Sequence, residues 1–205
     1  MLKQSVRRMH GATLLEMMIT VAILAILAAT AMPQMSAWIQ RYSLISTAEI
    51  MQNGLRQALS EAVRRNAPVA FVLTNATPST SNVTSAAAAA NGQNWMIRAL
   101  DSSYAILASN AYVNSYRTAE ASASIETTGP ATIIFNGMGR VLDSTGTLVG
   151  SSQIYRLSRD DSTQVYCVFV TPGGGVKMCD PAVSTGKPQA CQPQLTTAQC
   201  PAAGS

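Results

Sequence analysis

The chain has 205 residues and a formal charge of +4, a length that leaves room for one long helix and one modest globular domain. Three of its 14 basic residues, Lys3, Arg7 and Arg8, precede residue 11, so the rest carries 11 basic against 10 acidic side chains. This near-neutral balance argues against a nucleic-acid-binding domain, which needs a basic patch or stripe. The sole histidine is His10, so residues 12–205 have no imidazole for a catalytic triad or a zinc site.

An uncharged apolar segment, residues 17–32, follows the basic N-terminal stretch. At about 1.5 Å per residue, a helix over residues 12–33 matches the ~30 Å core of a bilayer. The basic residues before it predict a single pass with the N-terminus in the cytoplasm. Glu16 lies within this span, where a carboxylate costs on the order of 2.5 to 3.5 kcal/mol at the bilayer centre. It therefore needs a positively charged partner.

Three interpretations of this segment compete. A secretory signal cleaved at Ala29-Thr30-Ala31 leaves Glu16 unexplained, and so does a plain membrane anchor. The third is the processing signal of type IV pilins, which these residues resemble. In that family a prepilin peptidase cleaves after a glycine, the new first residue is N-methylated, and a glutamate follows four residues later. The resemblance implies cleavage of residues 1–11 at Gly11 and methylation of Ala12, a position where the family usually has Phe.

This resemblance also gives Glu16 a partner. Cleavage at Gly11 creates an ammonium group on Ala12, which can neutralise the carboxylate of Glu16 on a neighbouring subunit. The apolar helix over residues 12–33 is then expected to be an assembly element.

Residues 34–66 have the apolar period of an amphipathic helix. Pro33 is expected to kink the helix without ending it, and Pro68 is expected to stop it near Arg65 or Asn66. The predicted buried stripe consists of Ile45, Ala48, Met51, Leu55, Ala58, Leu59 and Ala62.

Residues 67–179 are expected to form an antiparallel β domain, because short β-branched and aromatic runs alternate with glycine-rich turns. The predicted strands cover residues 68–74, 94–99, 131–136, 139–142, 153–158, 164–171 and 175–179. Residues 75–92 lack periodicity and are expected to be an exposed loop, while residues 101–130 are compatible with a long loop, a helical turn or an added strand. The predicted fold class is therefore α+β, a long N-terminal helix packed on antiparallel sheets.

The C-terminal tail, residues 180–205, is expected to be held by cysteines. Cys167, Cys179, Cys191 and Cys200 contain no C-x-x-C pair, and their even number beyond a membrane segment favours periplasmic disulfides over a metal site. Cys167 and Cys179 flank the last predicted hairpin with 11 residues between them. This spacing predicts a Cys167–Cys179 disulfide across the hairpin and a Cys191–Cys200 disulfide in the tail.

Further blocks extend the resemblance along the chain. Residues 56–73 (RQALSEAVRRNAPVAFVL), 94–100 (NWMIRAL), 134–141 (IFNGMGRV) and 165–179 (VYCVFVTPGGGVKMC) resemble successive blocks of the FimT/FimU/GspH family of minor pilins and minor pseudopilins. The resemblance implies a structural, priming subunit of the type IV pilus tip that contacts other minor pilins and the major pilin. It would be held first in the inner membrane, with its β domain (residues 67–179, the head) in the periplasm, and later in the filament. The runner-up is a minor pseudopilin of a type II secretion system.

The remaining alternatives are an enzyme and a DNA receptor. The absence of histidine from residues 12–205, of a recognisable carboxylate pair and of any cofactor motif disfavours an enzyme. Some relatives that take up DNA carry Gly-Arg-x-Arg before the last hairpin cysteine. Here those positions are Gly174, Gly175, Val176 and Lys177, and Lys187 is the only further cation downstream. With one arginine replaced by glycine, Lys177 and Lys187 are the candidate DNA contacts.

Overall fold

The structure is a computed structural model that describes residues 13–118, 125–159, 162–192, 195 and 200, without the side chains at 30–34, 36, 37 and 162. The predicted processing residues Gly11 and Ala12 therefore lie outside the described residues. The chain divides into two compact units, Met1–Gln40 and Arg41–Ser205, and each is described by itself.

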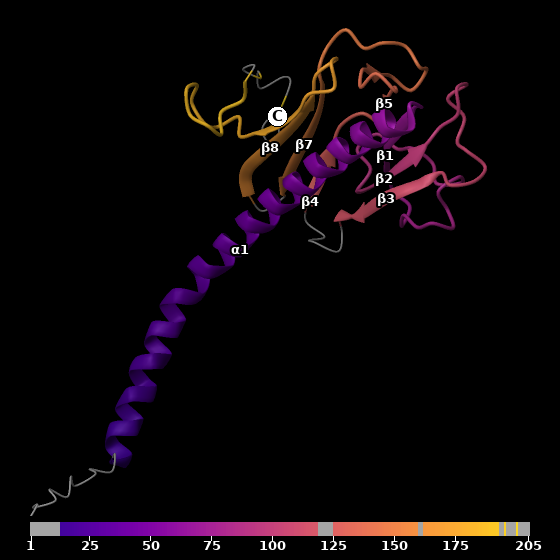
Figure 1. The fold of residues 1–205 in the computed structure, drawn as a ribbon. Helices are drawn as coiled ribbons and strands as arrows, with labels where there is room; N and C mark the ends of the chain where they lie inside the picture. Colours follow the sequence, from indigo (N-terminus) through magenta and orange to yellow (C-terminus); the bar gives the residue numbers. More distant parts are fainter. Residues whose placement is uncertain (1–12, 119–124, 160–161, 193–194, 196–199, 201–205) are drawn as a thin grey trace, which may run out of the picture. The chain divides into compact units, whose positions relative to one another are not determined.

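One long helix, α1 (Leu14–Arg65), runs from the first unit into the second, and Pro33 does not end it (Figure 1). At its C-terminal end the amide of Asn66 bonds the carbonyl of Val63, and the amide of Ala67 bonds the carbonyl of Ala62. Asn66 has a φ of 49°, so these bonds form a Schellman motif with Asn66 in the left-handed position. The helix ends where the sequence predicts, but this cap ends it before Pro68 is reached.

The second unit contains two antiparallel sheets, as predicted (Figure 1). The first has the order β3-β2-β1-β5-β6, built from Tyr112–Arg117, Asn94–Ala99, Val69–Thr74, Thr132–Phe135 and Val141–Leu142. The second has the order β4-β7-β8-β9, built from Ile125–Thr128, Gln153–Arg159, Ser162–Val170 and Val176–Cys179. Each predicted strand has its counterpart, and β3 and β4 form within residues 101–130, which the sequence left open. The α+β fold class is confirmed.

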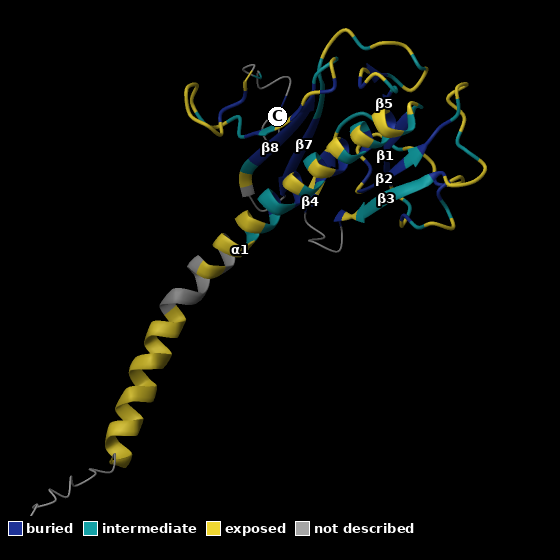
Figure 2. Ribbon diagram, in the orientation of Figure 1, coloured by how far each residue is buried: buried dark blue, intermediate teal, exposed yellow. Residues whose placement is uncertain are grey.

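The main core lies between α1 and one face of each sheet. The helix contributes Leu44, Ala48, Met51, Leu55, Ala58 and Ala62, each at most 1% exposed. The stripe therefore matches the prediction, except that Leu44 is fully buried where Ile45 and Leu59 are only partly so. Phe71 of β1 and Tyr155 of β7 meet edge to face with centroids 5.6 Å apart, which joins the two sheets inside this core. Figure 2 shows β7 and β8 largely in the dark blue of buried residues, whereas the edge strand β3 is mostly teal, the colour of intermediate residues.

Irregular chain covers the opposite face of the first sheet. Val83 and Ala86 are buried there against Ala70, Val72 and Met96 of β1 and β2. Nη1 of Arg98 donates to the carbonyl oxygens of Val83 and Ala86, both at 3.2 Å. The prediction of an exposed loop over residues 75–92 is thus wrong in part. The backbone is irregular, but Val83 and Ala86 cover part of the sheet, and the half-buried Arg98 holds the segment through its hydrogen bonds.

The C-terminal tail covers the opposite face of the second sheet. Val165, Cys167, Phe169 and Cys179 face outward and are buried with Cys191 and Cys200. The tail turns back along β9, since the amide of Asp180 bonds the carbonyl of Gln189 at 2.8 Å and Asp180 bridges Ala190 in parallel.

The disulfides join Cys167 to Cys200 and Cys179 to Cys191, with Cα–Cα distances of 6.2 and 4.8 Å. The predicted register is confirmed, because Cys167 and Cys179 lie directly opposite each other in the β8–β9 hairpin. The predicted pairing is wrong, because both hairpin sulfurs point to the outer face, where the returning tail supplies a partner for each.

Candidate functional site

The first unit presents apolar side chains to its surroundings along the N-terminal part of α1, drawn in yellow in Figure 2. More than half of each side chain is exposed for Leu14, Leu15, Met17, Met18, Ile19, Val21, Ile23, Leu24, Ile26, Leu27, Met35, Trp38 and Ile39. So continuous an apolar surface marks an interaction site, because a soluble monomer rarely exposes one. Glu16 lies at the N-terminal end of this surface and is itself exposed.

Within the part of the chain that the structure describes, no helix has both the length and the apolar character needed to cross a membrane.

The structure gives Glu16 a second, local setting that the sequence analysis missed. Its amide donates to Oγ1 of Thr13 at 3.2 Å, so Thr13 caps α1 and Glu16 occupies the third helical position. The signal was present in Thr13-Leu14-Leu15-Glu16, which has the T-x-x-E spacing of a capping box. A carboxylate in the first turn also complements the positive end of the helix dipole. Glu16 is therefore suited to the start of the helix before any subunit contact is made.

A second candidate site lies in the other unit, at the outer edge of β9, the last strand of its sheet. Nη2 of Arg56 donates to the carbonyl oxygen of Val176 at 3.3 Å. The side-chain oxygen of Gln52, in the amide orientation that satisfies its neighbours, accepts from the amide of Met178 at 2.9 Å and from Arg56 at 3.2 Å. Two polar residues of α1 thus occupy part of the backbone edge that would otherwise be open to another strand.

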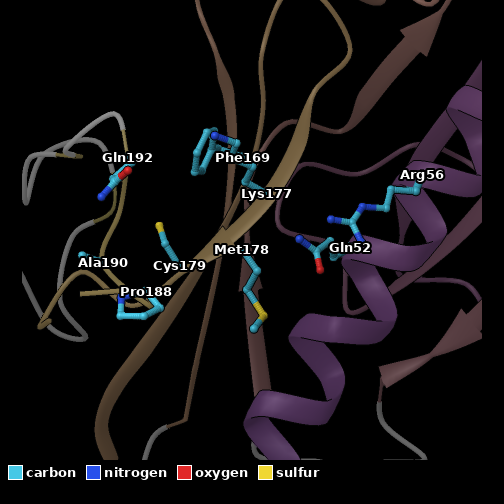
Figure 3. A pocket seen from close by; sticks show the side chains of 9 residues that line it. All are labelled: Gln52, Arg56, Phe169, Lys177, Met178, Cys179, Pro188, Ala190 and Gln192. Carbon is cyan, nitrogen blue, oxygen red and sulfur yellow. The ribbon is translucent and has the colours of Figure 1, made fainter. Parts of the chain in front are cut away.

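A groove of about 330 Å³ follows this edge from α1 to the tail. Figure 3 shows Gln52 and Arg56 on the α1 side, Pro188, Ala190 and Gln192 on the tail side, and β9 between them. The predicted candidate Lys177 lines the groove and is exposed, and so is Arg56 of α1. Lys187 lines an adjoining hollow of the tail loop that shares Pro188 with the groove. The two predicted cations therefore lie in neighbouring sites.

The four cysteines are also drawn together. The Sγ atoms of Cys167, Cys179 and Cys191 lie within 4.8 Å of one another, a spacing that three thiolates could use to hold a metal ion. All three are bonded in disulfides, however, and a disulfide sulfur is no thiolate ligand. The cluster is therefore a covalent staple for the tail.

Buried titratable groups in the head serve packing. Burial raises the pKa of Tyr155 far above its ordinary value, so the phenol stays neutral within the core. Burial lowers the pKa of Arg156, and the nearby carboxylate of Glu126 partly opposes this shift. At the surface, hydrogen bonds from the hydroxyl of Thr145 and from the amides of Thr147 and Thr145 lower the pKa of Asp143 and close a tight turn.

Two family models match separate parts of the chain. A family model described as Type II transport protein GspH matches residues 47–174, and the Prokaryotic N-terminal methylation motif matches residues 6–32. Two crystal structures of the type IV minor pilin FimU of Pseudomonas aeruginosa (strain PAO1) are similar, with TM-scores of 0.49 and 0.43 at 14% and 13% identity. They cover 69% and 65% of this chain, and 91% and 90% of theirs. No curated protein sequence matches.

The GspH match spans more than half of the chain, from the buried stripe of α1 to the β8–β9 turn. The methylation motif covers the segment in which the sequence predicts processing. The predicted family is confirmed: the chain belongs to the GspH family of pilin-like proteins and carries a prokaryotic N-terminal methylation motif.

Proposed function

We propose that this protein is a minor pilin, a structural and priming subunit at the tip of a type IV pilus. In this proposal a prepilin peptidase cleaves it after Gly11, and Ala12 is N-methylated. The observation that carries the proposal is the exposed apolar surface of α1 with a carboxylate, Glu16, at its N-terminal end. Such a surface is costly in water and is suited to packing against the equivalent helices of other subunits.

The charge pair supplies the register of that packing. A methylated ammonium on Ala12 of one subunit and the Glu16 carboxylate of the next would neutralise each other in an apolar bundle. Either charge left alone there would destabilise the bundle, so subunits in the wrong register are disfavoured. Partners in this proposal are other minor pilins and the major pilin, and the protein would reside in the inner membrane before assembly. We assign it no catalytic activity, since residues 12–205 contain no histidine.

A minor pseudopilin of a type II secretion system is the second candidate. The description of the matching family, a type II transport protein, favours it, and the same helix would serve either filament. The disulfide-held tail resembles that of minor pilins more than that of pseudopilins, and this favours the pilus in our proposal. Deletion of the gene separates the two, because loss of a minor pilin reduces piliation, whereas loss of a pseudopilin blocks protein secretion and leaves pili intact.

The Glu16→Ala variant tests the proposal. We expect it to be processed, to accumulate in the inner membrane with its disulfides formed, and to be missing from sheared pili, since the Ala12 ammonium of its neighbour loses its partner. Intact-mass analysis of membrane and pilus fractions measures both processing and incorporation, and a chain that begins at methylated Ala12 is the expected product.

Glu49→Ala is the matched control, because Glu49 is an exposed carboxylate on the same helix but within the second unit. It should enter pili normally. If Glu16→Ala reaches sheared pili at the level of the unaltered protein, the inter-subunit charge pair does not recruit this subunit. A mature chain beginning at Met32 would show instead that residues 1–31 are an ordinary secretory signal.

A further inference from the structure

The groove at the edge of β9 shares no lining residue with the exposed apolar surface of the N-terminal part of α1. It belongs entirely to the second unit, and its walls come from α1, β9 and the tail. The tail is kept beside β9 by the Cys179–Cys191 disulfide and by the hydrogen bond between Asp180 and Gln189. The groove is therefore a built feature: a disulfide and a backbone hydrogen bond fix its tail wall, and side-chain hydrogen bonds from Gln52 and Arg56 hold its α1 wall to β9.

Recognition in this groove must rely on side chains more than on strand addition. The carbonyl of Val176 already accepts from Arg56, and the amide of Met178 already donates to Gln52. A strand added to β9 would have to displace both contacts before it could pair with those two groups.

The charge of the lining is one-sided. Arg56 and Lys177 are both exposed, and none of the nine described lining residues is acidic. The carboxylate of Asp180, three residues after Lys177 in the chain, accepts from the amide of Ala182 at 2.8 Å and so is held in its own turn. The floor beside the cations is apolar, formed by Phe169, Met178 and Pro188. A side chain with an aliphatic stem and a carboxylate head fits this combination.

From this geometry we propose that the groove binds an acidic segment of a protein partner, whose carboxylates pair with Arg56 and Lys177 while its side-chain stems pack on Met178 and Pro188. The identity of that partner as a neighbouring filament subunit rests on the proposed function. The charge pattern favours a protein segment over DNA. Proteins bind a phosphate backbone through many cationic contacts at once, and two cations beside an apolar floor supply few of them.

The test measures binding to the purified full-length protein in detergent micelles. The probe is a fluorescently labelled hexaglutamate peptide, followed by anisotropy at low salt, with hexaglutamine as the uncharged comparison. We expect hexaglutamate alone to bind, and added salt to weaken it because the contacts are exposed. Lys177→Gln and Arg56→Gln should each reduce affinity about fivefold, the effect of losing roughly 1 kcal/mol of charge-assisted contact.

Arg64→Gln is the matched control, because Arg64 is an exposed arginine on the same helix but does not line the groove. Its Nη2 atom lies 2.6 Å from a carboxylate oxygen of Glu61. It should leave the affinity unchanged. Near-UV circular dichroism checks folding, and Lys177→Gln is the decisive variant because the Lys177 side chain is exposed, whereas Arg56 also holds the edge of β9. The proposal is overturned if hexaglutamate does not bind, if Arg64→Gln weakens binding equally, or if an oligothymidylate of matched charge binds more tightly at the same residues.

Because this test uses isolated protein, its result is independent of pilus incorporation. Normal peptide binding together with normal entry of Glu16→Ala into pili would retain the groove and reject the proposed assembly role. Loss of Glu16→Ala from pili, together with no peptide binding, would retain the proposed assembly role and reject the groove as a binding site.

Discussion

At the scale of single residues, Gly54 shows how closely α1 packs on the first sheet. A β-carbon at this position would lie 2.6 to 2.8 Å from the indole ring of Trp95, which is itself 2% exposed. That ring has little room to move, because it lies 5.1 Å from the ring of Phe71 and 6.0 Å from that of Tyr116, centroid to centroid. Helix propensity alone does not predict a glycine here, since alanine is favoured in a helix by about 1 kcal/mol.

We therefore predict that Gly54→Ala destabilises the head. Overpacking against the indole should cost about 1 to 3 kcal/mol, and the gain in helix propensity should offset only part of this cost. Urea unfolding of the full chain in detergent, followed by Trp fluorescence, measures the difference. Asn53→Ala is the control, because Asn53 is an exposed neighbour on the same helix and should have little effect. A Gly54→Ala protein more stable than the unaltered one would show that the indole yields easily.

At the scale of elements, the sequence predicts strands well where the chain alternates and poorly where packing decides. The runs that became β1, β2, β7 and β8 are rich in β-branched and aromatic residues, and their bounds are correct to within two residues. By contrast β3, with the sequence Tyr-Val-Asn-Ser-Tyr-Arg, is half-exposed along its length and becomes a strand through pairing with β2. Such an edge strand depends on its neighbour more than on its own composition.

The disulfides show the same limit. Hairpin spacing is a local property, so the sequence correctly places Cys167 opposite Cys179. The disulfide pairing depends instead on which segment covers the outer face of the sheet, and this is a tertiary property. Nothing in the spacing of Cys191 and Cys200 indicates that the tail turns back over β8 and β9. The exposed groove residue Arg56 was missed for the same reason, since its partner in β9 is 120 residues further along the chain.

We predict that non-reducing peptide mapping will recover Cys167 linked to Cys200 and Cys179 linked to Cys191. The two bridges close loops of 33 and 12 residues. On loop-entropy grounds their removal as paired serine variants should cost about 4 and about 3 kcal/mol respectively. Denaturant midpoints of the two double variants measure this order. A peptide that links Cys167 to Cys179 would contradict the connectivity.

At the scale of the whole molecule, the chain combines two units with opposite surface chemistry on one continuous helix. In the second unit the apolar stripe of α1 is buried in the core of the head, whose described residues run from Leu44 to Cys200. In the first unit apolar side chains are exposed, which is intelligible only if other molecules cover them. The same helix therefore acts as the core element of a fold and as an interaction surface.

This division predicts that matched leucine truncations will have separate effects. Leu55 is fully buried, so Leu55→Ala should destabilise the head by about 2 to 5 kcal/mol through lost packing and a residual cavity. Leu24 is 64% exposed in the first unit, so Leu24→Ala should leave the head's urea midpoint unchanged, because it removes no contact from that core. Near-UV circular dichroism reports on the head through its buried aromatic rings.

In the filament the order should reverse: Leu24→Ala should lower incorporation into sheared pili even though its head is as stable as the unaltered one. A loss of head stability in Leu24→Ala would mean that the two units fold as one, and assembly defects could not then be separated from folding defects.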